Sequence, residues 1–469
     1  MLRKITPLAA LALLAAALLT GCGGSAKSTP PRTPAPAPAS ASAAATPAAA
    51  TPAVGASLPL EYSRCMRAHG VPRFPDPVDG HIVLTPASGV DPDSPAVEAA
   101  SAACAKYAPP GSSPAGQAAA GKPAAGKPAA GNPAAITPAT WRALAASLKA
   151  DATAGRFSGA VLVARDGHTV LDAGYGYADR ATGTANTPGT RFCIASIGKL
   201  FTAVAIGQLA EQGRLSFDAP VGDYLTGLPA AIARQVTIAE LLDMTAGLGN
   251  TVLGRANPPR TLAAMVALIA RERPQFTPGT KFSYSNDDYI LLGAVVQRLS
   301  GESYAGYLRQ HILGPAGMTH TGYAVYVPAR VPGLAHGYAQ TGSRLTDISG
   351  RPQIANPSGG AYSTTGDLLR FAEALLGHRL LTPAMTAEIL IPRVNSPQPG
   401  GPAVDEYTYG FAYQQVNGVT FVGHNGGTPG YEGQLDIYPR TGYVAVVLAN
   451  EDNVMIPVIR QTETILTNS

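Results

Sequence analysis

Residues 189–213 read GTRFCIASIGKLFTAVAIGQLAEQG, and this stretch determines how the rest of the chain is interpreted. A short apolar run leads into Ser196 and Lys199, and a longer one continues to Gln212, where Gly213 follows. The longer run predicts an apolar helix that glycine ends. Ser196 and Lys199 are three residues apart at the start of this helix, so their side chains lie on one face.

The pairing of Ser196 with Lys199 suits nucleophilic catalysis. A serine hydroxyl is a poor nucleophile unless a base lies nearby, and a partly desolvated lysine with a lowered pKa can act as that base. Because a Ser-x-x-Lys pair occurs by chance in most chains of this length, the pair needs support from elsewhere in the sequence.

Two further motifs follow in order along the chain. Residues 278–286 read PGTKFSYSN, and residues 423–430 read GHNGGTPG. With Ser196-Ile197-Gly198-Lys199 they resemble the three motifs of the serine β-lactamase and penicillin-binding-protein superfamily. The Tyr-x-Asn form of the second motif is similar to the branch that holds class C β-lactamases, DD-carboxypeptidases of the same shape, and related esterases and aminopeptidases. The resemblance spans about residues 137–469.

The resemblance implies a catalytic role for three residues. Ser196 attacks an acyl carbonyl to form an acyl-enzyme, and Lys199 and Tyr284 relay the proton to and from the leaving group. A tyrosine suits this task if cationic neighbours favour its phenolate, which is what we expect for Tyr284. Asn286 offers its amide to the acyl-side carbonyl of the substrate.

The third motif is expected to bind the substrate through His424, Gly426 and Gly427. Its glycines let a backbone strand approach the substrate closely. By resemblance, the N–H groups of Ser196 and Gly427 form the oxyanion hole, usually the largest contribution in acyl transfer.

The chain departs from the superfamily pattern at the start of the third motif. In β-lactamases and many peptidases a lysine there meets the substrate carboxylate, whereas this chain has His424, which is mostly neutral at pH 7 unless its pKa is raised. The difference weakens the case for a β-lactamase and leaves the charge state of His424 open. Asp243-Met244 stands where relatives more often have Thr-His, and Cys193 is expected to be a buried packing thiol.

Strand-like runs lie near both ends of residues 137–469, and the segment between them is mainly helical. Two runs joined by a tight turn at Asp166-Gly167 follow a helix at 138–150. The strand-like runs are residues 158–165, 168–177, 407–416, 419–423, 433–438 and 443–449.

This order predicts an α/β (α+β) domain in which an antiparallel sheet, assembled from both ends and flanked by helices, lies beside a helical subdomain. A further helix is expected from about Asn453. The resemblance implies an active site in the groove between the two parts. It puts Ser196 at the start of the central helix, Tyr284 on a loop and His424 on an edge strand of the sheet.

The N-terminus is typical of an exported lipoprotein. Residues 1–21 combine a basic start with a short apolar stretch, as in a signal peptide. The sequence Leu-Thr-Gly-Cys that ends at Cys22 looks like a bacterial lipobox, in which the cysteine is acylated. Residues 22–57 are mostly Ala, Pro, Ser, Thr and Gly and predict a tether. We therefore expect a protein anchored on the extracytoplasmic face of the cell membrane.

A denser segment, residues 58–110, contains Cys65 and Cys104. Outside the cytoplasm two cysteines are more often bridged than free. A segment this short also needs a covalent cross-link to be stable, so we expect a disulfide between Cys65 and Cys104. The segment resembles a short module of actinobacterial exported proteins, and its role is left open. His69 beside Cys65 does not make a metal site. Residues 111–136 contain five-residue repeats typical of a spacer.

Composition and motifs exclude several classes of function. The net charge of +4 falls to +2 once Arg3 and Lys4 are removed with the leader, which is too little for a nucleic-acid-binding face. After the leader no run of 18 apolar residues occurs, which excludes a multispan membrane protein. Motifs for metal ligation, nucleotide binding and an α/β-hydrolase triad are absent from the sequence. We expect a monomer without cofactor, metal or nucleic acid.

These observations predict an exported, lipid-anchored serine hydrolase that forms an acyl-enzyme on Ser196. Its substrate is a small peptide, as for a D-alanyl carboxypeptidase or transpeptidase-like enzyme, or an ester; the expected location mildly favours a peptide. The rival hypothesis is a non-catalytic protein that binds wall fragments or β-lactams in the same groove. A further alternative places the main function in residues 58–110, as an adhesion module.

Overall fold

The computed structural model describes a part of the small N-terminal module and almost all of the C-terminal domain. The described residues are 60–72, 74, 97, 99–100, 103–104, 136–255, 257–323, 325–326, 330–341, 344–351, 353–396 and 404–468. The expected signal peptide, Cys22, the tether and the spacer up to residue 135 lie outside them. The chain divides into two compact units at residues 127/128. None of the described helices is both long and apolar enough to cross a membrane.

The first unit contains helix α1 (Leu60–Ala68). One side of α1 contributes Met66 to a small core that excludes water. The other buried members of this core are Val71, Phe74, Val97, Ala100 and Cys104.

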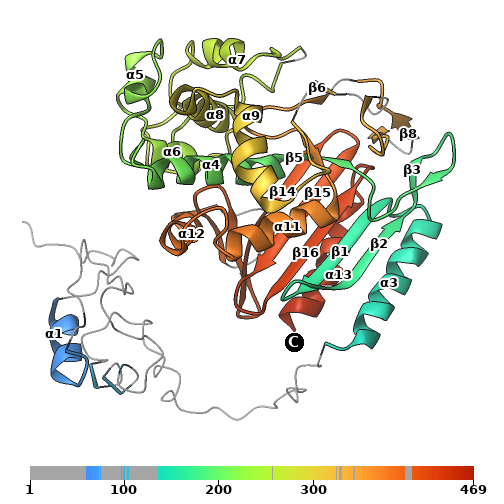
Figure 1. Cartoon of the computed structure of the whole chain (residues 1–469), viewed down its shortest axis with the longest axis horizontal. Coiled ribbons are helices and arrows are strands. Elements are labelled where there is room, and N and C mark those ends of the chain that lie inside the picture. Colours follow the sequence, from blue (N-terminus) through green and yellow to red (C-terminus); the bar gives the residue numbers. More distant parts are fainter. Residues whose placement is uncertain are drawn as a thin grey trace, which may run out of the picture. The chain divides into compact units, whose positions relative to one another are not determined.

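The second unit is organised around an antiparallel sheet of eight strands in the order β11-β12-β13-β14-β15-β16-β1-β2 (Figure 1). The first strand of the domain, β1, pairs with its last strand, β16, and β2 pairs with β1, so the sheet is assembled from both ends as the sequence predicts. The strands are β1 (Gly159–Arg165), β2 (His168–Tyr175), β11 (Val394–Asn395), β12 (Val404–Tyr407), β13 (Ala412–Val416), β14 (Val419–Thr428), β15 (Tyr431–Tyr438) and β16 (Tyr443–Ala449).

Two strand predictions near the C-terminus are wrong in extent. Residues 407–416 form parts of two strands, because the chain reverses between β12 and β13 at Gly410, whose φ is +95°. Glycine adopts such a φ readily, and Thr408 closes the turn by accepting a hydrogen bond from the Phe411 N–H. Strand β14 extends to Thr428 instead of ending at Gly423, because its last residues pair with β15.

Helices cover one face of the sheet and continue into the helical subdomain. At their centre lies α4, in which Leu200–Leu209 are all buried, as expected for a helix surrounded by protein. The predicted apolar helix is thereby confirmed, one residue longer at its start. The helices of this part are α4 (Lys199–Glu211), α5 (Ala230–Ala233), α6 (Ile238–Leu242), α7 (Leu262–Ile269), α8 (Asn286–Ser300), α9 (Tyr304–Leu308), α10 (Gly314–Ala316), α11 (Thr365–Leu376) and α12 (Pro383–Leu390), with 3₁₀ turns at Ser196–Gly198 and Val221–Asp223 and a π turn at Arg309–Leu313.

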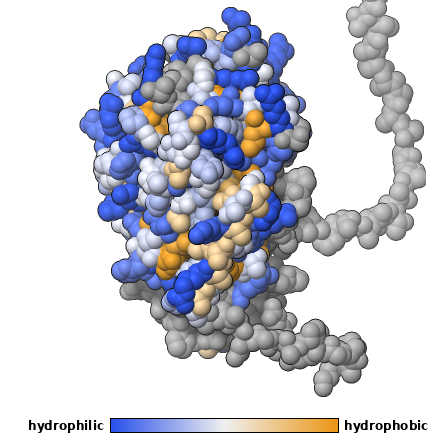
Figure 2. All heavy atoms as spheres, turned by 90° about the vertical axis from the view of Figure 1, so that its right-hand side faces the viewer, coloured by the Kyte–Doolittle hydropathy of each residue, from blue (hydrophilic) through white to orange (hydrophobic). Residues whose placement is uncertain are grey.

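Two terminal helices, α3 (Pro138–Thr153) and α13 (Met455–Thr467), cover the opposite face of the sheet. They form a second core in which Trp141 and Leu148 of α3 and Val458 of α13 are buried against the strands. Figure 2 faces the side on which α3 and β2 lie and shows isolated hydrophobic patches among hydrophilic side chains. The predicted α+β architecture, with helices on both faces, is confirmed.

Short two-stranded sheets lie in the segments that connect the main sheet with the helices. The pair β5–β10 matters most for function, because β5 leads directly into Ser196. These strands are β3 (Tyr177–Asp179), β4 (Thr184–Ala185), β5 (Phe192–Ala195), β6 (Val325–Tyr326), β7 (Tyr338–Thr341), β8 (Arg344–Asp347), β9 (Gln353–Ile354) and β10 (Ala361–Ser363).

Candidate active site

Ser196 lies where the buried strand β5 turns into the 3₁₀ turn that precedes α4. The turn is made at Ala195, whose φ of +41° is strained for a residue with a side chain. Strand β14 passes directly beside it: a Cβ added to Gly426 would lie 2.3 Å from the Ile194 carbonyl oxygen and 2.9 Å from the Ser196 nitrogen. The sheet and the central helix together hold the serine in one position.

Lys199 is fully buried and has three polar partners. Its Nζ lies 3.2 Å from Ser196 Oγ, 2.6 Å from Asn286 Oδ1 and 2.8 Å from the Ser358 carbonyl oxygen. Burial lowers the pKa of Lys199 well below its usual value, which favours the neutral amine. A neutral amine has two hydrogens and one lone pair, so donation to Asn286 and Ser358 leaves the lone pair for the serine hydroxyl.

Asp288 is a buried carboxyl group near Lys199. A negative charge on it would favour the ammonium form of Lys199 over the neutral amine. Neither of its oxygens has a hydrogen-bond partner within the described part of the chain. Burial raises the pKa of Asp288 well above its usual value, which favours the uncharged acid. A charge on Asp288 raises the pKa of Lys199, but the burial of Lys199 outweighs this effect.

Tyr284 comes from the loop before α8 and donates its hydroxyl hydrogen to Ser196 Oγ at 2.7 Å. Burial raises the pKa of Tyr284 to about 12, and the hydrogen bond to Ser196 opposes the increase. About 37% of the residue stays exposed, on the side that lines the groove. The expectation of a phenolate is wrong: the raised pKa keeps the phenol protonated at pH 7, although Lys199 Nζ lies only 4.7 Å from the ring centre.

Asn286 begins α8 directly after the capping residue Ser285 and is held by a second amide, Asn250. Asn250 Oδ1 accepts hydrogen bonds from the Asn286 N–H at 2.8 Å and from Asn286 Nδ2 at 2.7 Å, and its own Nδ2 donates to the Tyr284 carbonyl oxygen at 3.1 Å. Sequence reasoning missed Asn250, because it lies in no motif and reaches the site from a separate loop.

His424 is 3% exposed and contacts Tyr407. Its Nδ1–H donates to the Asn425 carbonyl oxygen, and its Nε2 accepts from the Tyr407 hydroxyl at 3.0 Å. Burial, followed by repulsion from Lys199, lowers the pKa of His424 to about 3, although the bond to Asn425 opposes the change. The imidazole is therefore neutral at pH 7, and it offers no fixed charge to a substrate carboxylate. The contact between Tyr407 and His424 could not be predicted from the sequence, because Tyr407 lies in none of the three motifs.

The strand that carries His424 is not an edge strand, because β13 lies beside it in the sheet. The ladder between them ends at Gly423, however, so residues 424–428 continue beyond β13. Within this segment a Cβ on Gly426 would collide with the backbone before Ser196, whereas one on Gly427 would meet nothing within 4 Å. Gly426 thus packs against the nucleophile turn, and Gly427 faces open space.

These residues border a groove of about 770 Å³. Ser196, Tyr284, Asn286, His424 and Gly427 are among its lining residues. The structure thus gathers the predicted residues of all three motifs around one hydroxyl group, with Gly426 behind it.

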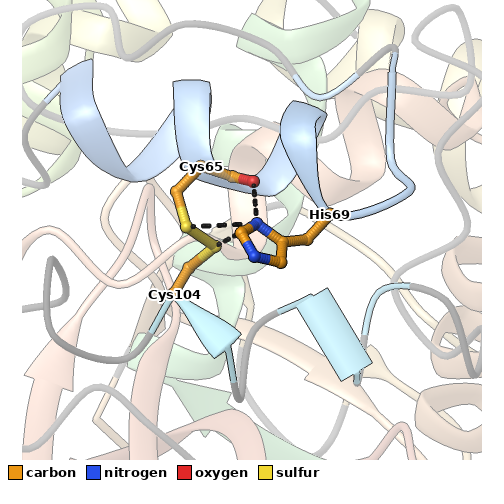
Figure 3. Close-up of side chains that lie close together, drawn as sticks. All are labelled: Cys65, His69 and Cys104. Carbon is orange, nitrogen blue, oxygen red and sulfur yellow. Dashed lines mark hydrogen bonds between the residues drawn. A yellow bond between two sulfur atoms is a disulfide. The ribbon is translucent and has the colours of Figure 1, made fainter.

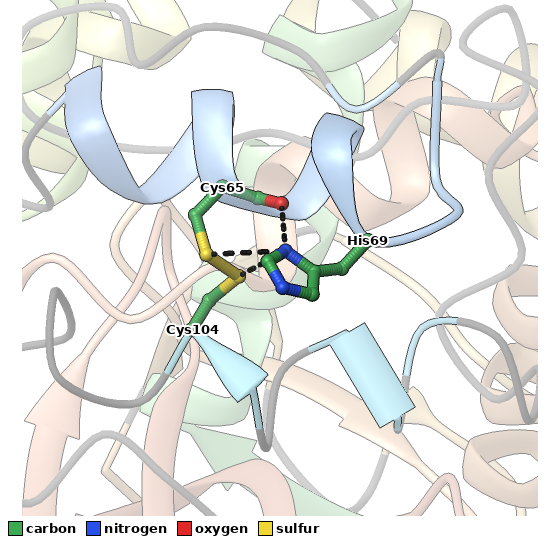
Figure 4. Close-up of a disulfide and its surroundings, with 3 residues drawn as sticks. All are labelled: Cys65, His69 and Cys104. Carbon is green, nitrogen blue, oxygen red and sulfur yellow. Dashed lines mark hydrogen bonds between the residues drawn. A yellow bond between two sulfur atoms is a disulfide. The ribbon is translucent and has the colours of Figure 1, made fainter.

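The predicted pair in the first unit, Cys65 and Cys104, is joined by a disulfide with a Cα–Cα distance of 5.7 Å (Figure 4). His69, one helical turn after Cys65, points its imidazole at the bridge, as Figure 3 shows. The three side chains could offer ligand atoms within 4.8 Å of one another, but both sulfurs are already bonded. That leaves His69 as the one conventional ligand of this cluster.

Comparisons with known proteins agree with the geometry. A beta-lactamase family model matches residues 141–462. The chain is 31% identical over 299 residues to PbpX of Bacillus subtilis (strain 168), provisionally named a penicillin-binding protein, covering 62% of this chain and 70% of PbpX. It is 29% identical over 308 residues to penicillin-binding protein 4 of Amycolatopsis lactamdurans, covering 62% and 79%. The crystal structure of a penicillin-binding protein from Bacillus halodurans matches with 31% identity and a TM-score of 0.61, covering 68% and 98%.

Proposed function

The chain belongs to the beta-lactamase family of serine hydrolases and penicillin-binding-protein homologues, and on that premise we propose that it hydrolyses an ester or a peptide through an acyl-enzyme on Ser196. One observation carries the proposal. The Ser196 hydroxyl oxygen lies within hydrogen-bond distance of both a buried amine, Lys199 Nζ at 3.2 Å, and a groove-lining phenol, Tyr284 Oη at 2.7 Å. One group can take a proton while the other gives one.

In the proposed acylation, the neutral Lys199 amine accepts the Ser196 hydroxyl proton as Oγ bonds to the substrate carbonyl carbon. The N–H groups of Ser196 and Gly427 bind the developing oxyanion. When the bond to the leaving group breaks, Tyr284 gives its proton to the leaving oxygen or nitrogen and regains one from the Lys199 ammonium. Water then attacks the acyl-enzyme, the same groups return the protons, and Ser196 is restored.

The neutral state of His424 bears on the substrate. Recognition of a carboxylate in the groove is weaker without a fixed positive charge at this position. An ester, or an amide whose leaving part is not anchored by a carboxylate there, is therefore favoured over a β-lactam. Because two relatives are named penicillin-binding proteins, acylation of Ser196 by a penicillin is a second reaction to measure.

We further propose that Cys22 is acylated and holds the protein on the extracytoplasmic face of the membrane. The lipobox-like sequence and the composition of residues 22–57 support this location. Replacement of Cys22 by Ser should move the protein from the membrane fraction to the soluble fraction. Retention of the variant in the membrane would contradict the anchor.

The test of the catalytic proposal is time-resolved intact mass spectrometry of the whole chain with p-nitrophenyl acetate, p-nitrophenyl butyrate, nitrocefin and a D-Ala-D-Ala peptide. A transient adduct that is absent in Ser196→Ala would establish the acyl-enzyme, and the substrate with the highest turnover would identify the reaction class. A folded protein that neither forms an adduct nor turns over any of the four would instead support a binding protein that uses the same groove.

A further inference from the structure

Ser196 lies at the junction of two hollows. Besides the groove of about 770 Å³, a pocket of about 260 Å³ opens beside the serine. Ser196, Asn286 and Gly427 line both of them. Because Ser196 and Gly427 hold the reacting carbonyl in the proposed mechanism, the two sides of the scissile bond extend into different hollows.

The position of Tyr284 assigns the two sides. Tyr284 lines the large groove, and neither it nor His424 is among the described residues that line the small pocket. The leaving atom has to lie within reach of the phenol that protonates it. The leaving group therefore occupies the large groove, and the acyl group occupies the small pocket.

The small pocket suits a short, uncharged group. Its volume lies below the roughly 300–1,000 Å³ that is typical of pockets for larger ligands. None of its described lining residues is acidic or basic. Leu253, Pro258 and Ile354 contribute apolar surface, and Gln353, Asn356, Ser358 and Thr428 contribute polar surface. Backbone packs closely behind one lining residue, since a Cβ on Gly360 would lie 2.7 Å from the Ile354 carbonyl oxygen.

Leu253 forms a wall of the pocket that the fold holds in place. The Leu253 residue is 38% exposed, whereas many other leucines of this domain are buried. The two residues before it are fixed, because the Thr251 and Val252 N–H groups donate to the Asp287 carboxylate at 2.6 and 3.3 Å. Since Asp287 directly follows Asn286, the position of the wall depends on the helix that carries the site.

The large groove differs from the small pocket chiefly in size. Away from Ser196 it is lined by both polar and apolar side chains from the sheet and α13. The polar ones are Asp405, Gln414, Gln434, Asp436, Arg460 and Glu463, and the apolar ones include Val416, Phe421, Ile456 and Ile459. Such a mixed lining suits a large leaving group with both polar and apolar parts.

We infer that this enzyme removes a short uncharged acyl group from a large leaving group, and that Leu253 sets the upper limit on acyl length. This inference rests on the proposed acyl-enzyme function and specifies its substrate class. It places the bulk of the substrate on the leaving side of the bond.

The acyl side is tested with p-nitrophenyl acetate, butyrate and hexanoate and the whole chain. Because one methylene in a confined pocket changes kcat/KM by about tenfold or more, hexanoate should react at least about tenfold more slowly than acetate. Leu253→Ala should reduce the difference between acetate and hexanoate to about threefold. Leu253→Phe should make butyrate, too, react at least about tenfold more slowly than acetate. Ile391→Ala removes an equally exposed aliphatic side chain that lines neither hollow, and it should leave the series unchanged.

The leaving side is tested with an acetate ester of maltotriose against ethyl acetate, which share the acyl group. The maltotriose ester should have the higher kcat/KM, by about tenfold or more, if the large groove binds its leaving group. Two results would overturn the inference: adducts on Ser196 with a preference for hexanoate over acetate, or a length series that both Leu253 variants leave unaltered. Absence of any adduct in a folded protein would instead overturn the proposed function itself.

Discussion

Lys199 Nζ lies 4.7 Å and the His424 imidazole centre 6.2 Å from the centre of the Tyr284 ring. Burial acts on both basic groups in the same direction, because it penalises the protonated form. The site therefore favours a neutral amine, and at pH 7 it holds a neutral imidazole and a protonated phenol. That arrangement differs from a cation-rich site, in which a tyrosine would lose its proton.

Replacement of Lys199 by Met should abolish most activity, because the length of the side chain is kept while the base is lost. A general base contributes about 10²–10⁴-fold, so kcat/KM should fall by that factor. Steady-state kinetics with p-nitrophenyl acetate measures the loss, and circular dichroism shows whether the variant is folded. Activity within about tenfold of the parent would exclude Lys199 as the base.

His424 should make the protein less stable in acid. Its pKa is about 3 in the folded state and near 6.5 in the unfolded chain, so between these values the unfolded chain binds a proton that the folded protein does not. Stability is therefore lost as the pH falls through this window. Urea unfolding at pH 7 and pH 4.5 should show a smaller decrease for His424→Gln than for the parent; equal decreases would mean that the imidazole is not buried in its neutral form.

At the scale of the strand, the two glycines of β14 should tolerate alanine very differently. Gly426→Ala places a methyl group against the backbone before Ser196, and a displacement of about 1 Å can lower kcat about 10²-fold. Gly427→Ala retains the N–H group and points the methyl group into open space, so it should cost about threefold or less. Kinetics of the two variants under the same conditions measures the contrast, and similar losses would contradict the proposed packing of β14.

Helices and strands could be predicted from the sequence where apolar residues form a continuous run and turn residues mark its ends. The buried helix after Ser196, the hairpin at Asp166-Gly167 and the strands from both chain ends follow from apolar runs and turn residues. The reversal at Gly410 could not be predicted, because aromatic and β-branched residues on both sides of it resemble one continuous strand.

In the site, the motif residues could be predicted but their protonation states and supports could not. The neutral form of Tyr284 depends on burial and on the state of Lys199, which only packing determines. Asn250 reaches the motif residues from a separate loop and Tyr407 from the end of β12, and no local pattern identifies such contacts. Likewise, the ladder that ends at Gly423 leaves part of an internal strand open, which strand patterns do not show.

At the scale of the whole molecule, the disulfide and the hydrolase site should be independent, because they lie in separate compact units. Cys65→Ser should lower the stability of the first unit by about 2–5 kcal/mol, the usual cost of losing a disulfide in a small domain. Ester hydrolysis by the whole chain should stay at the parental rate. Limited proteolysis followed by mass spectrometry measures the first effect, and a parallel loss of hydrolysis would show that the module supports the site.

The pairing of β1 with β16 joins the first strand of the catalytic domain to its last. Contacts between distant parts of a sequence form slowly, because the intervening chain has to be ordered before they are gained. The sheet, and with it the strand that faces Ser196, cannot be completed until the C-terminus is available. The site around Ser196 is therefore complete only after the last strand of the domain has been synthesised, and the growing chain is inactive until then.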